Sequence, residues 1–117
     1  MIAVVWQFDV LPGKNDEFEV LYGADGPWTA LGRRSRSFLG SSFLKDLAQP
    51  SRYIVIEYWS EMVVYERHHA DFQHEVDALE RQRNELVEAA VPLGLFNALD
   101  VPERAGPTWS QRTGRPD

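Results

Sequence analysis

The sequence contains no cysteine, which excludes disulfide bonds, a thiolate nucleophile and any cysteine-ligated metal site. A chain without disulfides suits a reducing compartment, so we expect a cytoplasmic protein. Long apolar stretches are missing as well, and no run approaches the roughly 20 residues of a membrane-spanning helix. The first residues alternate in character and lack a basic start, so we expect no signal peptide and no membrane association.

Positive charge is also scarce, since 12 Lys and Arg against 18 Asp and Glu leave a net charge of −6. Binding to a phosphate backbone needs a basic surface, so we predict no nucleic-acid partner. The short basic cluster at residues 33–36 is more typical of a helix C-terminus. The three histidines, His68, His69 and His74, lack the i, i+4 spacing of a helical metal pair, so we predict no bound metal.

Aromatic residues, in contrast, are abundant: four Trp, four Tyr and six Phe in 117 residues. Such side chains fill cores, and they also line pockets for flat organic ligands. The length allows one core and no second domain. We therefore predict one domain over residues 1–101, followed by a tail over 102–117 that is rich in Pro, Gly and Arg and is mobile or wrapped around a partner.

The hydrophobic pattern predicts the element order β-α-β-β-α-β. Period-two alternation predicts four strands, over residues 2–10, 38–45, 52–59 and 93–101. A first helix begins at Asn15 or Asp16 and is interrupted by the Gly- and Pro-containing segment 23–27. A second helical region runs from Ser60 to about Ala90, with a break near residue 70.

This order is that of a ferredoxin-like α+β fold with a four-stranded antiparallel sheet. Two helical regions cover only one face of such a sheet, and the other face should then be polar. It is apolar instead, because Ala3, Val5, Ile54 and Ile56 lie on the face opposite the expected core. An uncovered apolar face marks an interface, so we predict a homodimer with the two sheets packed face to face. The alternative is a monomer whose C-terminal tail covers this face.

The segment YWSEMVVYERH, residues 58–68, resembles the signature of the antibiotic biosynthesis monooxygenase (ABM) family of dimeric α/β-barrel proteins. In that family a Trp closes the third strand, a Ser- and acid-rich helix start follows, and an aromatic residue and a His come six and nine positions after the Trp. Here these residues are Trp59, Tyr65 and His68. Weaker matches extend the resemblance to residues 2–101.

The resemblance implies a monooxygenase that uses no metal, flavin or other cofactor. A small aromatic or polyketide-like compound would bind between helices and sheet, lose a proton and react with dioxygen directly, while the protein stabilises the developing oxyanion. Quinone-forming members also use an Asn four positions before the Trp, where this chain has Val55. A haem-degrading branch uses Asn, Trp and His at positions that read Trp6, His68 and Ala78 here, so we do not expect haem degradation.

Six residues are predicted to form the site. His68 is predicted to be catalytic because an unperturbed pKa of about 6.5 suits acid–base chemistry, and Tyr65, one turn away, is predicted to assist it. The predicted substrate-binding residues are Trp59, Trp6, Phe72 and Trp28. His69 is expected to face solvent.

Each of the six residues also has a purely structural interpretation, as a packed histidine or as aromatic core. An open cavity of several hundred Å³ that contains His68 and Tyr65 would favour an enzyme. A core filled by Trp6, Trp28 and Phe72 would favour the alternative, a non-catalytic small-ligand-binding or stress-response domain of the same fold.

Overall fold

A computed structural model of the chain describes residues 1–100. The elements in chain order are β1 (Ile2–Val10), α1 (Asn15–Tyr22), α2 (Pro27–Gly32), β2 (Phe38–Lys45), β3 (Arg52–Trp59), α3 (Met62–Asp71), α4 (Gln73–Asn84) and β4 (Val87–Asn97). The strands form one antiparallel sheet in the order β2-β3-β1-β4. The predicted ferredoxin-like α+β fold is therefore confirmed. The predicted tail over 102–117 lies outside the described residues, and the domain boundary stays a prediction.

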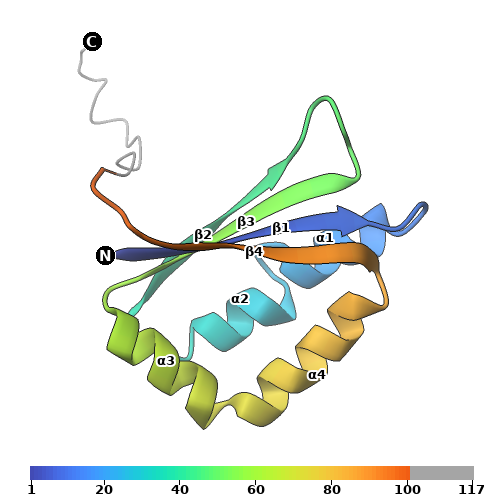
Figure 1. Cartoon of the computed structure of the whole chain (residues 1–117). Coiled ribbons are helices and arrows are strands. Elements are labelled where there is room, and N and C mark those ends of the chain that lie inside the picture. Colours follow the sequence, from blue (N-terminus) through green and yellow to red (C-terminus); the bar gives the residue numbers. More distant parts are fainter. Residues whose placement is uncertain (101–117) are drawn as a thin grey trace.

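All four helices lie on one side of the sheet, as Figure 1 shows. Residues that face each other across two antiparallel strands share a face of the sheet. The pairs Val4–Glu57 and Phe8–Tyr53 therefore lie on the face that the helices cover, and the pair Val5–Ile56 lies on the other face. Among the described residues, no helix combines the length and the apolar character that a membrane span requires.

The last strand begins earlier than the sequence pattern predicts. β4 starts at Val87, which pairs with Val10, whereas the predicted strand over 93–101 was preceded by helix up to about Ala90. Pro92 does not mark the end of a helix but lies within this edge strand, beside a shift of register in the β1–β4 pairing. An edge strand tolerates a missing N–H group, and a bulge absorbs the irregularity. The predicted bounds were therefore wrong.

Both predicted breaks in the helical regions are present. The first separates α1 from α2, and a Cβ atom at Gly26 would collide with the carbonyl oxygen of Val20. Only glycine permits so close an approach, and Pro27 then begins α2 at a position where its missing N–H costs nothing. The second break falls at Phe72, between α3 and α4.

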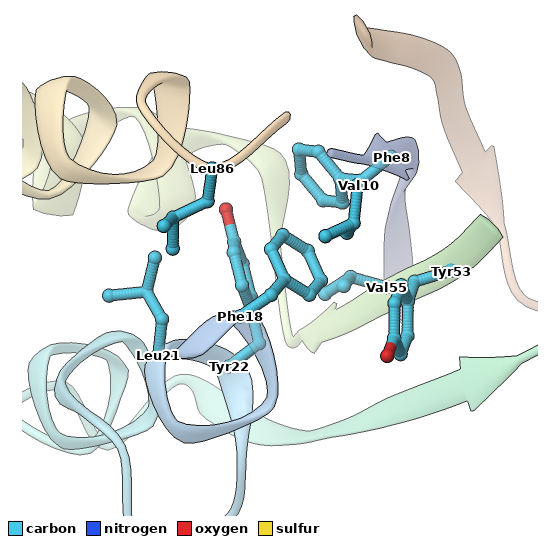
Figure 2. Close-up of a cluster of buried hydrophobic side chains, with 8 residues drawn as sticks. All are labelled: Phe8, Val10, Phe18, Leu21, Tyr22, Tyr53, Val55 and Leu86. Carbon is cyan, nitrogen blue, oxygen red and sulfur yellow. The ribbon is translucent and has the colours of Figure 1, made fainter. Parts of the chain in front are cut away.

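The main core lies under the half of the sheet that α1 covers (Figure 2). Its buried members are Phe8, Val10, Phe18, Leu21, Tyr22, Tyr53, Val55 and Leu86. Phe18 is fully buried, and its ring contacts those of Phe8 and Tyr53 at centroid distances of 5.4 and 4.9 Å. Burial of such a side chain contributes about 2–3 kcal/mol. The core holds this end of the sheet against α1 and leaves the space nearer α3 and α4 for a cavity.

Candidate functional site

A cavity of about 90 Å³ lies between the helices and the sheet and is partly open to solvent. It is lined by Val4, Trp6, Phe8, Tyr22, Trp28, Val55, Glu57, Tyr65, His69, Glu80 and Arg83. These residues come from β1, β3 and all four helices. Ligand pockets usually measure about 300–1,000 Å³, so this cavity is small, and side chains must move before it admits a ring system.

Two stacked aromatic pairs form flat walls of the cavity. The ring of Trp6 is parallel to that of Phe8, with an interplanar angle of 3° and centroids 5.7 Å apart. Trp28 stacks on Tyr22 at 14° and 5.6 Å. The indole N–H of Trp28 is buried and has no hydrogen-bond partner within residues 1–100. These walls suit a flat ring, and the buried Trp28 N–H is a hydrogen-bond donor without a partner in the described residues.

Glu57 places a carboxyl group on this otherwise apolar wall of the sheet. Its Oε1 accepts a hydrogen bond from Trp59 Nε1 at 3.1 Å. Burial raises the pKa of this carboxyl above its usual value, because the charged form is poorly solvated, and the hydrogen bond from Trp59 opposes the change. An elevated pKa in a cavity is typical of a group that exchanges protons with a ligand.

Tyr65 and His69 lie one helical turn apart on α3 and both line the cavity, with ring centroids 4.4 Å apart. Burial raises the pKa of Tyr65 to about 12, so its phenol is protonated at neutral pH and acts as a hydrogen-bond donor. Burial lowers the pKa of His69 and favours the neutral imidazole.

Arg83 supplies a buried positive charge at the cavity wall. Only 7% of the residue is exposed, and its guanidinium carbon lies 5.3 Å from the ring centroid of Trp6 and 5.4 Å from that of Phe8. Its Nε and Nη2 atoms both donate to Asn84 Oδ1 at 3.1 Å. This geometry fixes the guanidinium beside the aromatic wall, where its charge would favour a bound anion.

The structure divides the six predicted site residues into two groups. Trp6, Trp28 and Tyr65 line the cavity. The other three stack beside it: the ring of His68 lies between those of Trp59 and Phe72, at centroid distances of 4.9 and 4.8 Å. His68 and Phe72 line a separate, more open groove. Burial lowers the pKa of His68 and thus favours its neutral form. The roles of all six residues stay predictions.

The expectation that His69 faces solvent was wrong. On a helix the residue four positions after Tyr65 shares its face, and that residue is His69, whereas His68 is rotated towards Trp59. The i, i+4 spacing of Tyr65 and His69 in the sequence already indicated that the two side chains share one face of the helix.

The cavity also contains charged residues that the sequence analysis missed, among them Glu57 and Arg83, and each of these two had a signal in the sequence. Glu57 is the only charged residue on the inward side of β3, between Val55 and Trp59. Arg83 occupies a stripe with Val76 and Leu79 at helical spacing. In such a sequence, a charged residue at an inward-facing position of an otherwise apolar strand or helix pattern indicates a residue that lines a cavity.

The first three quarters of the described residues, which include β1 to α3, match a known protein family. Residues 1–76 match the family model described as antibiotic biosynthesis monooxygenase, which is more than half of the chain. The chain belongs to the ABM family. The resemblance carried by Trp59, Tyr65 and His68 is thereby confirmed at the level of the family. A search of curated proteins finds no match.

Solved structures of other ABM-fold proteins agree with this assignment. SnoaB, a cofactor-independent oxygenase from Streptomyces nogalater, is 24% identical with a TM-score of 0.63, over 87% of this chain and 97% of that chain. A proposed antibiotic biosynthesis monooxygenase from Deinococcus radiodurans is 17% identical with a TM-score of 0.64, over 91% and 100%. A protein from Mycobacterium tuberculosis is 14% identical with a TM-score of 0.66, over 87% and 98%. At these identities the likeness shows a shared fold.

Proposed function

We propose that this ABM-family protein is a cofactor-independent monooxygenase that acts on a small aromatic compound bound in the cavity. The observation that carries the proposal is the cavity itself, where flat walls at Trp6 and Trp28 meet the polar groups of the partly buried Tyr65 and the buried Arg83. Membership of the ABM family and the likeness to SnoaB, a cofactor-independent oxygenase, support the same chemistry.

The volume of the cavity and the chemistry of its walls limit the range of possible substrates. A cavity of about 150 Å³ holds one benzene ring, so a space of about 90 Å³ requires wall side chains to shift on binding. Trp28 is the side chain best placed to move, since it is half-buried and follows the Gly- and Pro-containing break between α1 and α2. Compounds of one or two rings need a smaller shift than a large polycyclic compound does.

The reaction needs a proton removed from the substrate and an anion stabilised. The resulting electron-rich carbanion or enolate reacts with dioxygen, so that a CH₂ group and O₂ yield a carbonyl group and water. Arg83 stabilises the anion by its charge, and the Trp28 N–H and the Tyr65 hydroxyl donate hydrogen bonds to the developing oxyanion. His68 lies outside the cavity, so its proposed role is to position Trp59, on which it packs.

Oxygen consumption tests the proposal directly. Purified protein treated with a chelator is offered a panel of one- and two-ring phenols, 2-tetralone and anthrone, and dissolved oxygen is followed with an electrode. We expect one O₂ consumed per product formed, and a loss of about 10- to 100-fold in kcat/KM for Tyr65→Phe. Tyr58→Phe, on the opposite face of the sheet, is the matched control. No oxygen consumption by wild-type protein across the panel would refute the proposal.

A second candidate function is a non-catalytic domain that binds a small ligand. The small volume of the cavity favours it, because Trp6 and Trp28 already occupy much of the space between helices and sheet. Calorimetric titration with the same panel separates the two functions. Binding without oxygen consumption or product would favour this candidate.

We also propose that the protein is a homodimer built on the apolar face of the sheet that the helices do not cover, here called the open face. Its centre is formed by Val5, Ile54 and Ile56, and around them Leu44, Val91 and Phe96 are 50%, 41% and 51% exposed. A two-fold axis would pack the same patch on itself. Light scattering on eluting protein should give twice the mass of the chain. A monomeric mass would favour coverage by the tail instead.

A further inference from the structure

We propose that Glu57 is the general base of this site, the group that takes the proton which the substrate loses before oxygen reacts. The inference rests on the proposed function and deepens it, because it names the atom that receives the proton. It also names the substrate class as aromatic or benzylic carbon acids and phenols, whose anions are electron-rich.

The position of Glu57 is the first argument. It pairs with Val4 across β1 and β3 on the side of the sheet that faces the helices, and it lines the cavity together with Trp28 and Tyr65. A ligand in the cavity therefore lies against this carboxyl group. No lysine or arginine forms a salt bridge with Glu57 anywhere in residues 1–100, although Arg83 lines the same cavity.

The hydrogen bonding of Glu57 is the second argument. In the described part of the chain its side chain has a single hydrogen bond, from Trp59 Nε1 to Oε1 at 3.1 Å. This bond fixes the orientation of the carboxyl group and leaves the other oxygen, Oε2, without a side-chain partner. Glu57 is partly buried in the cavity wall, where an apolar residue would pack at lower cost than a carboxyl group. Its presence is explained if Oε2 exchanges a proton with a ligand.

The groups that face the cavity from the packed helices favour this role. They are Tyr22 from α1, Tyr65 and His69 from α3, and Glu80 and Arg83 from α4. Burial raises the pKa of both tyrosines, so they are donors and not bases at neutral pH. Burial lowers the pKa of His69 and weakens it as a base, whereas burial makes the Glu57 carboxylate a stronger base than an exposed one.

The reaction balances with dioxygen as the only oxidant. The Glu57 carboxylate takes one proton from a substrate CH₂ group, and the electron pair stays on carbon. That carbon forms a C–O bond with O₂ and becomes a peroxide anion, to which Glu57 returns its proton. Loss of the remaining C–H proton and cleavage of the O–O bond then form the carbonyl group and release water.

The decisive variant is Glu57→Gln, which keeps the shape of the side chain and an oxygen that accepts from Trp59. We expect kcat for oxygen consumption to fall by about 100-fold or more, and the acidic limb of the pH–rate profile to disappear. Glu85→Gln, on the exposed end of α4, is the matched control and should retain wild-type activity. An active Glu57→Gln variant with an unchanged pH profile would overturn the inference, as would loss of activity in Glu80→Gln alone.

A second measurement separates proton removal from oxygenation. In D₂O without oxygen, wild-type protein should exchange the acidic C–H protons of 2-tetralone or anthrone for deuterium, detected by NMR, and Glu57→Gln should not. Exchange without oxygen consumption would support Glu57 as the base and refute the proposed monooxygenase. Oxygen consumption with equal exchange in both proteins would support the monooxygenase and refute Glu57 as the base. Absence of both exchange and oxygen consumption in wild-type protein would refute both.

Discussion

The two faces of the sheet are built from the same strands, yet they differ in how each apolar pattern is completed. On the helix-covered side of β3, Tyr53 and Trp59 are each 1% exposed, and the carboxyl group of Glu57 lies between them and opens into the cavity. On the open face, Ile54 and Ile56 are only partly buried and no charged residue interrupts them. One charge at an inward position turns a packing surface into a site, whereas the open face, whose charged pair Asp9–Arg52 lies at one end, is suited to a partner.

The largest effect is expected from a charge placed on the open face. Ile56→Asp should weaken the proposed dimer by about 1,000-fold, because an unpaired buried carboxylate costs about 2 kcal/mol and two-fold symmetry doubles the loss. Analytical ultracentrifugation over a range of concentrations measures the change. Leu47→Asp, at a fully exposed residue between β2 and β3, is the control and should leave the mass unchanged. An Ile56→Asp protein that dimerises like the wild type would contradict the contrast between the two faces.

A smaller effect is expected from the two neighbouring histidines on α3. His69→Ala should lower kcat/KM by about 10- to 100-fold with little loss of stability, because His69 lines the cavity. His68→Ala should instead lower the free energy of unfolding by about 2–3 kcal/mol, since it removes the ring packed between Trp59 and Phe72. Steady-state kinetics and urea unfolding of both variants check this. A stable but inactive His68→Ala protein would restore His68 to the catalytic role that the sequence predicts.

The smallest effect is on the pH dependence of stability. Burial raises the pKa of Glu57 in the folded state above the unfolded value of about 4.5. The free energy of unfolding therefore falls as the pH rises from about 4.5 through the folded-state pKa, and below about pH 4.5 this loss is absent. Glu57→Gln removes the loss and should raise Tm at pH 8 by about 4–8 °C for each kcal/mol regained. The two proteins should converge below about pH 4.5, since the carboxyl group is then neutral in both states. Thermal unfolding of both proteins between pH 4 and pH 8 measures this difference in Tm. A Glu57→Gln variant with a lower Tm than wild type at pH 8 would contradict the prediction.

Much of the fold was predictable because it depends on local alternation. The period-two pattern of β1 and β3 identified both strands and assigned Trp6 and Phe8 to the face that the helices cover. The break at residues 23–27 was predictable because glycine and proline are poor in a helix interior. The start of β4 was not, since the residues from Val87 to Ala90 fit helical and strand spacing equally well and pair as a strand only because β1 offers an unpaired edge.

The sequence by itself therefore determined the order of the elements, the family and an apolar open face, since each depends on residue types at fixed spacing. The i, i+4 spacing places His69 on the same helix face as Tyr65, but only the tertiary structure decided that this face meets the cavity while His68 packs against Trp59. The same holds for Glu57: alternation places it on the inward face, but the helices that pack over β3 determine that its carboxyl group meets a cavity.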